Sequence, residues 1–163
     1  MMASSGNERL PLCFGEENLS FLPATDSRSL FAGSSTRDQK FWQVHHNEGS
    51  SNQEVQKQMR QINLGKSKCK PINTIIHGRQ DNIRDICTNP NSKNVPCKNG
   101  QDNCFEGPNP YSVTICQETA NSRPGKCRYN CTKVEPVKIT VACEKGKPVH
   151  LERTRKVIIH DEL

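Results

Sequence analysis

The sequence of 163 residues contains little apolar material: hydrophobic residues make up 32% of it and aromatic residues 5%. It has no run of about 18 apolar residues, so a transmembrane helix is excluded. Its first segment, MMASSGNERLPLCFGEENLSFLPATDSRSLFAG, also lacks the apolar stretch of roughly 7 to 15 residues that a secretory signal peptide needs. A chain this polar suits one domain with a modest core, so a second source of stability is expected.

Cysteine is the residue that the chain has in excess. Nine are present, and eight of them fall between Cys69 and Cys143. This density is typical of a secreted domain crosslinked by disulfides. A zinc site is the alternative, but zinc ligands usually occur as closely spaced pairs, whereas the spacing from Cys87 to Cys97 is wide and that from Cys127 to Cys131 is irregular. The spacings therefore favour disulfides.

Positive charge is concentrated in one part of the chain. Residues 1–39 hold three Arg against five acidic residues, a net charge of −2, and residues 40–163 hold 20 Lys and Arg against 12 acidic residues, a net charge of +8. A surface of this sign attracts polyanions such as nucleic acids or anionic membranes. We interpret residues 1–39 as a disordered or atypical extension, with Cys13 exposed, and residues 40–163 as the folded domain.

The folded part begins with helical patterns. Phe41 and His45 are four residues apart and share one helical face. Ser51 followed by Glu54 predicts the capped start of a second helix, which ends near Asn63. A third, short helix is predicted from Asn82.

Strand patterns follow in the second half of the chain. YSVTIC and PVKITVAC alternate apolar and polar residues, and a Pro-Gly turn at residues 123–126 separates them. Helices followed by an antiparallel hairpin predict an α+β fold.

Four motifs, KFWQVHH, CKPINTIIH, NVPCKNGQDNC and VACEKGKPVHL, closely resemble the pancreatic-type ribonuclease (ribonuclease A) superfamily, which includes the angiogenins, from about Lys40 to Glu152. The resemblance implies a disulfide-stapled fold of three N-terminal helices and a long twisted antiparallel sheet. It implies a secreted endoribonuclease that cleaves single-stranded RNA 3′ of pyrimidines through a 2′,3′-cyclic phosphate, without metal or cofactor.

The resemblance also assigns catalytic roles to three residues. His45 is then the base that takes the proton of the 2′-hydroxyl, and His150 is the acid at the leaving 5′-oxygen. Lys70 stabilises the negative charge that develops on the phosphoryl oxygens. Imidazole suits both acid and base roles because its pKa lies near neutrality.

Substrate-binding roles follow from the same resemblance. Pyrimidine recognition falls on Thr74, beside Leu151, and the downstream purine subsite falls on Gln101, Asn103 and Glu144. Phosphate contacts outside the scissile position fall on Lys40 and Lys98.

Two departures from the family pattern stand out. Val44 occupies the position of a glutamine beside the first histidine, which weakens the expected positioning of the phosphate. The family implies bridges Cys69–Cys127, Cys87–Cys143 and Cys97–Cys104, but Val55 replaces the helix cysteine of the fourth bridge. Because the hairpin register puts them opposite each other, we expect Cys116 and the additional Cys131 to form a cross-strand disulfide.

A different class of function remains open. Val44 and the basic residues 153–156 favour a weakly catalytic, cationic binding protein of angiogenin-like or host-defence type. Expected partners are single-stranded RNA, the cytosolic ribonuclease inhibitor, and an anionic membrane or cell-surface receptor, and the chain is expected to be a monomer. An extracellular location is expected, with the endoplasmic reticulum as the alternative because the sequence ends in HDEL.

Overall fold

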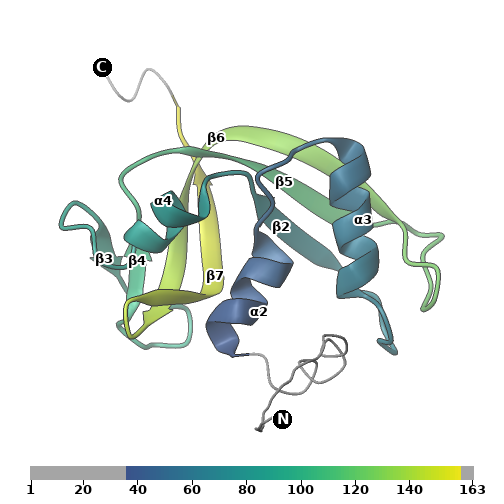
Figure 1. The fold of residues 1–163 in the computed structure, drawn as a ribbon, viewed down its shortest axis with the longest axis horizontal. Coiled ribbons are helices and arrows are strands. Elements are labelled where there is room, and N and C mark those ends of the chain that lie inside the picture. Colours follow the sequence, from purple (N-terminus) through teal and green to yellow (C-terminus); the bar gives the residue numbers. More distant parts are fainter. Residues whose placement is uncertain (1–35, 159–163) are drawn as a thin grey trace, which may run out of the picture. The chain divides into compact units, whose positions relative to one another are not determined.

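The computed structural model describes residues 36–158, so the expectations for residues 1–35, including Cys13, and for the HDEL tetrapeptide lie outside the described part of the chain. The described part has an α+β fold with three helices and a six-stranded antiparallel sheet (Figure 1), which confirms the predicted fold class. The elements in chain order are α2 (Arg37–His45), α3 (Asn52–Ile62), β2 (Ile72–Ile76), α4 (Gln80–Asp85), β3 (Lys93–Val95), β4 (Cys104–Glu106), β5 (Tyr111–Glu118), β6 (Tyr129–Glu144) and β7 (Lys147–Lys156).

The helices follow the predicted spacing closely. Helix α2 begins three residues before Lys40, and its only buried residue is Phe41, whose ring centroid lies 5.5 Å from that of His45. Helix α3 begins after Ser51, whose side chain accepts a hydrogen bond from the Glu54 backbone N–H at 3.1 Å. This cap satisfies one of the unpaired N–H groups of the first helical turn.

The sheet is organised around β6, a strand of 16 residues. Its first half pairs with β5, and its second half pairs with both β4 and β7. The strand order is β2-β5-β6-β4-β3, with β7 paired to β6. Figure 1 shows α3 beside the region where β5 and β6 pair, and α4 near β4 and β7. One strand therefore connects the two regions of the sheet that the helices cover.

Two hydrophobic clusters form the main core, and β2 contributes to both. Ile76 packs in a cluster with Phe41 and residues of α4, β5 and β6, whereas its neighbour Ile75 packs with Val55 and Met59 of α3. Both isoleucines are fully buried. Successive side chains of a strand point to opposite faces, so a single strand can join two separate clusters.

Four disulfides crosslink the described residues, namely Cys69–Cys127, Cys87–Cys143, Cys97–Cys104 and Cys116–Cys131. Cys116 lies directly opposite Cys131 in the β5–β6 pairing, with their Cα atoms 4.0 Å apart. Val55, at the helix position of the missing bridge, is 1% exposed and belongs to the same cluster as Cys116. Apolar packing thus replaces the covalent link between α3 and the sheet.

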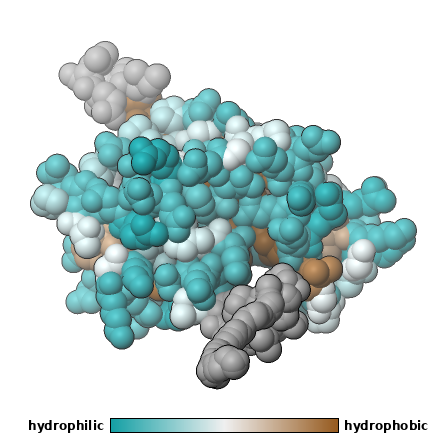
Figure 2. Space-filling view, in the orientation of Figure 1, coloured by the Kyte–Doolittle hydropathy of each residue, from teal (hydrophilic) through white to brown (hydrophobic). Residues whose placement is uncertain are grey.

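The surface of the described part is predominantly polar. Figure 2 shows a face covered mostly by hydrophilic residues, with small separate hydrophobic areas. None of the described helices is long and apolar enough to cross a membrane.

The cross-strand disulfide Cys116–Cys131 is predicted to stabilise the fold less than the disulfide Cys69–Cys127, which joins segments farther apart in the sequence. Cys116 and Cys131 are 15 residues apart, whereas Cys69 and Cys127 are 58 residues apart. The entropy that a crosslink removes from the unfolded chain grows with loop length. We expect a Cys116→Ala/Cys131→Ala variant to lose about 3 kcal/mol of unfolding free energy and a Cys69→Ala/Cys127→Ala variant about 4 kcal/mol.

The measurement is equilibrium unfolding in urea for the two double variants and the parent protein. A larger loss for the Cys116→Ala/Cys131→Ala variant than for the Cys69→Ala/Cys127→Ala variant would contradict this ranking.

Candidate active site

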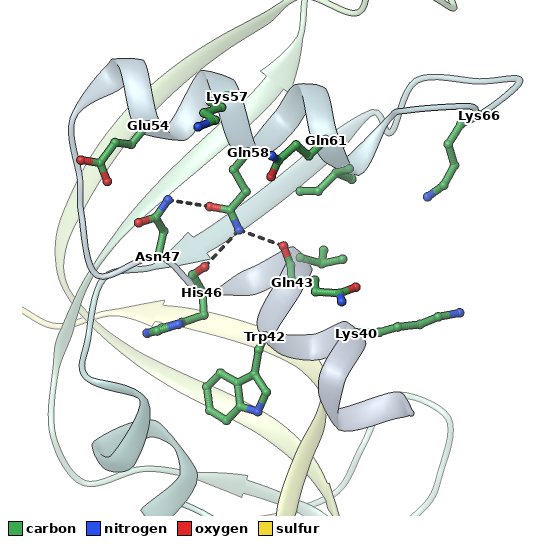
Figure 3. A pocket seen from close by; sticks show the side chains of 12 residues that line it. Lys40, Trp42, Gln43, His46, Asn47, Glu54, Lys57, Gln58, Gln61 and Lys66 are labelled. Carbon is green, nitrogen blue, oxygen red and sulfur yellow. Dashed lines mark hydrogen bonds between the residues drawn. The ribbon is translucent and has the colours of Figure 1, made fainter. Parts of the chain in front are cut away.

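The C-terminal end of α2 is held by side-chain amides from two other elements. The last carbonyl groups of a helix have no partner within the helix. Here the buried Gln58 of α3 donates through Nε2 to the carbonyls of Gln43 and His46, at 2.9 and 3.0 Å (Figure 3). The buried Asn73 of β2 donates through Nδ2 to the carbonyl of Val44 at 2.9 Å. The position of His45 is therefore fixed from both sides.

His45 has a defined tautomer in its neutral form. Its Nδ1 lies 2.8 Å from the carbonyl oxygen of Thr74. A carbonyl can only accept, so Nδ1 carries the proton and Nε2 has a free lone pair. The pKa of His45 is lowered from 6.5 to about 4: burial is the main cause, the Thr74 hydrogen bond opposes it, and the charges of Lys70 and His150 contribute to the lowering. His45 is thus a neutral imidazole near pH 7.

Lys70 is half-buried and lies two residues before the start of β2. Its Nζ donates to Oδ1 of Asn73 at 2.9 Å, and its backbone N–H donates to Oδ1 of Asn63 at the same distance. Burial lowers the pKa of Lys70 below its usual value, and the nearby charge of Lys66 adds to this effect. The amide of Asn73 therefore contacts both Lys70 and the helix end that carries His45.

His150 lies on β7 with its side chain 56% exposed. Its Nε2 is 3.3 Å from Oε1 of Glu152, whose side chain is only 5% exposed. The other carboxylate oxygen of Glu152 accepts from the backbone N–H of Lys98. The buried carboxylate thus joins the imidazole to the loop that precedes β4, and it leaves Nδ1 of His150 for other contacts.

The three residues assigned to catalysis interact electrostatically. The charges of Lys70 and His150 both lower the pKa of His45. Helix α2 packs against both β2, which follows Lys70, and β7, which carries His150, and its last residue, His45, contacts the carbonyl of Thr74 on β2. The fold therefore brings one ammonium group and two imidazoles into one neighbourhood.

The predicted base-binding residues form two groups, one for the pyrimidine (Thr74 and Leu151) and one for the downstream purine (Gln101, Asn103 and Glu144). Thr74 is half-buried on β2, and Leu151 follows His150 on β7 and packs against the core. Asn103 is held near the end of β6, because its Nδ2 donates to the carbonyl of Cys143 at 2.9 Å. Gln101 is exposed in the loop closed by the Cys97–Cys104 disulfide.

Among the remaining residues predicted to contact substrate, one already has a partner within the chain. Glu144 forms an exposed ion pair with Arg37 of α2, so substrate would compete with that pair. Lys40 and Lys98 have exposed side chains. Val44 is half-buried, and its backbone carbonyl, not its side chain, takes part in the hydrogen bonding of the site.

Sequence reasoning missed Asn73, Glu152 and Gln58, which hold the three candidate residues or their helix in place. Two of them could have been found from their spacing in the sequence. Asn73 follows Lys70 by three residues, and Glu152 follows His150 by two on the same strand. Gln58 could not, because its contacts with α2 bridge separate helices.

Comparison with known proteins agrees with this arrangement. Residues 36–152 match the family model of pancreatic ribonuclease. The chain belongs to the pancreatic ribonuclease family. The match covers most of the described residues, from the start of α2 to Glu152 on β7, and ribonuclease activity is the activity of this family.

Individual relatives are moderately similar to this pancreatic ribonuclease family member. The brain ribonuclease of Bos taurus is 34% identical over 119 residues, which are 69% of this chain and 69% of that protein. The brain ribonuclease of Ovis aries has the same identity over 69% of this chain and 80% of its own length. The X-ray structure of zebrafish RNase5 matches with a TM-score of 0.60 and 29% identity, covering 72% of this chain and 93% of that one.

The lowered pKa of His45 predicts a pH-dependent stability. Between pH 6.5 and about 4 the unfolded chain binds a proton at His45 that the folded protein resists, so stability falls as the pH falls through this window. The loss attributable to His45 is at most about 3 kcal/mol. A His45→Ala variant lacks this proton uptake, and its unfolding free energy is expected to decline less.

Urea unfolding of both proteins at pH 7 and pH 4 measures the difference. Equal losses in the parent protein and in the His45→Ala variant would show that His45 does not resist protonation.

Proposed function

We propose that this chain is a secreted, metal-independent endoribonuclease that cleaves single-stranded RNA on the 3′ side of pyrimidines. The reaction is transphosphorylation to a 2′,3′-cyclic phosphate, followed by hydrolysis. The single observation that carries the proposal is the convergence of His45, Lys70 and His150: α2 packs against both β2 and β7, and the charges of Lys70 and His150 act on His45. Family membership supports ribonuclease activity in general.

The base step fits the neutral form of His45. The 2′-hydroxyl attacks the adjacent phosphorus, and its proton passes to the free Nε2 of His45 while Nδ1 stays bonded to Thr74. A pKa of about 4 keeps this nitrogen unprotonated at neutral pH. The carbonyl of Thr74 holds the ring, so little reorganisation is needed during the transfer.

The acid step and the charge stabilisation fall on the other two residues. The 5′-oxygen leaves with a proton from His150, whose Nδ1 is free because Nε2 faces Glu152. Negative charge on the phosphoryl oxygens is stabilised by the ammonium group of Lys70, which Asn73 orients. In the hydrolysis step the two histidines exchange roles, and water replaces the leaving group. These groups supply acid, base and counter-charge without a metal ion.

Pyrimidine preference is assigned to Thr74. Its hydroxyl can donate or accept, so it can pair with the edge of either uracil or cytosine. The same residue orients His45 through its backbone carbonyl. One residue of β2 would therefore both recognise the nucleobase and orient the catalytic base, His45.

Secretion is supported by the four disulfides, which form and persist in oxidising compartments. The cationic surface is consistent with a polyanionic substrate. Extracellular RNA is the substrate that fits both features.

Removal of either histidine tests the catalytic assignment. We expect His45→Ala and His150→Ala each to lower kcat/KM on RNA by roughly 10² to 10⁴-fold, the usual contribution of an acid or base. Activity of the parent protein should persist in a chelator. A Lys126→Ala variant removes an exposed lysine on the β5–β6 turn and serves as the control. Full activity in both histidine variants would refute the proposal.

The base preference is tested with homopolymers. We expect cleavage of polyuridine and polycytidine to exceed that of polyadenosine, and Thr74→Val to reduce the two pyrimidine rates about tenfold, the equivalent of one hydrogen bond. The backbone contact with His45 is retained in this variant. Thr88→Val, at an exposed threonine after α4, is the matched control. Equal cleavage rates on all three polymers would refute the proposed preference for pyrimidines.

A further inference from the structure

The start of β6 contains the tripeptide Asn130-Cys131-Thr132, which has the form of an acceptor sequence for N-linked glycosylation. Such a sequence needs an asparagine followed two residues later by serine or threonine, with no proline between them. Within residues 36–158 it occurs once, and a second one, Asn18-Leu19-Ser20, lies outside the described residues. The surroundings of Asn130 decide whether the folded protein has room for a glycan.

Both side chains that define the acceptor are exposed on the face of the sheet away from α3. Cys131 packs against the cluster that contains Val55 of α3. Successive side chains of a strand point to opposite faces, so Asn130 and Thr132 point away from this cluster. Both are exposed, and within residues 36–158 neither side chain forms a hydrogen bond. A glycan on Asn130 would therefore break no bond of the folded protein.

The neighbours of Asn130 leave space for a bulky group. Gln117, directly opposite on β5, is exposed, and Ile72, opposite Gln117 on β2, is 50% exposed. Residues 129–136 of β6 pair only with β5 among the described strands. Figure 1 shows the end of the β5–β6 hairpin extending past α3. The folded sheet can therefore carry a large hydrophilic substituent at this position.

The same face carries the proposed pyrimidine contact. Thr74 of β2 lies opposite Ile115 of β5, which lies opposite Thr132 of β6. Residues that lie opposite each other in a sheet point to the same face, so Thr74 and Asn130 share one face. Neighbouring strands are about 4.8 Å apart, so two strand spacings, about 10 Å, separate β2 from β6. A glycan would stand on the substrate side of the sheet and leave the packing of α3 unchanged.

The folded hairpin prevents the transfer reaction itself. A glycosyltransferase has to hold the asparagine and the threonine in its own active site, as part of an unpaired peptide. Here all three acceptor residues are paired with β5, and the central residue, Cys131, is joined to Cys116 by a disulfide. A paired and crosslinked segment cannot leave the sheet. The asparagine must therefore be modified before β5 and β6 pair.

We propose that Asn130 is an N-glycosylation site that is modified in the nascent chain, before the Cys116–Cys131 disulfide closes. The co-substrate is an oligosaccharide carried on a lipid diphosphate. Nδ2 of Asn130 forms a bond with the anomeric carbon of the first sugar and gives up one proton to a base of the transferase. The bond from that carbon to the diphosphate oxygen breaks, and the lipid diphosphate leaves. The proposal rests on the secretory location proposed above.

The test uses the full chain expressed in mammalian cells, with a cleavable signal peptide added before Met1 so that delivery to the endoplasmic reticulum is assured. Asn18→Gln removes the other acceptor sequence. We expect a fraction of the protein to lose mass when treated with peptide N-glycosidase, and mass spectrometry of the peptide to find residue 130 converted to aspartate. Asn130→Gln and Thr132→Ala should each abolish the mass loss, whereas the matched control Thr132→Ser should retain it.

An unglycosylated parent protein whose four disulfides have formed would overturn the proposal. RNA cleavage by the parent protein is measured separately. Cleavage without a glycan refutes the glycosylation site alone, and a glycan without cleavage refutes the ribonuclease assignment alone.

A second variant tests the order of events. Cys116→Ser removes the disulfide but keeps the acceptor sequence intact, so residues 130–132 stay accessible for longer. We expect a larger glycosylated fraction than in the parent protein. The matched control, Cys97→Ser/Cys104→Ser, removes a disulfide outside the β5–β6 hairpin. A glycosylated fraction for Cys116→Ser that does not exceed that of the control would overturn the proposed order.

Discussion

The carbonyl groups at the end of α2 need hydrogen-bond partners, and buried amides from two other elements provide them. Asn73 donates to one of these carbonyls, and Gln58 donates to two. A buried carbonyl left unpaired costs about 1 to 3 kcal/mol, so these amides strongly favour one position of the helix end. His45 is the last residue of that helix. The geometry of the candidate site thus depends on satisfying the backbone of α2.

Strand β2 combines structural and chemical roles through the alternation of its residues. Asn73 and Ile75 face α3, where both are buried, whereas Ile76 faces the other cluster. The carbonyl of Thr74 meanwhile holds the ring of His45. A shift of one residue in the pairing with β5 would exchange these faces and separate the catalytic groups. The pairing of β2 with β5 is therefore as important for the site as for the core.

Local patterns in the sequence predicted much of this molecule. The spacing of Phe41 and His45, the cap at Ser51, and the alternation in β5 and β6 each reflect periodicities of a helix or strand. The opposition of Cys116 and Cys131 also followed from hairpin register. Contacts such as Gln58 to α2 and Arg37 to Glu144 did not, because they join elements distant in sequence and leave no periodic signal. The family resemblance supplied the candidate residues, but not the buried amides and the carboxylate that orient them.

All four disulfides begin at Cys69 or later in the chain. The described segment before it, with α2 and α3, is consequently attached without a disulfide, through the peptide backbone, packing, hydrogen bonds and the Arg37–Glu144 ion pair. If the backbone were cleaved between Ile62 and Cys69, the proposed base could dissociate with a fragment that contains both helices. The remaining crosslinked portion would keep Lys70 and His150. Such a chain could lose and regain its reactive centre by reversible association of two pieces.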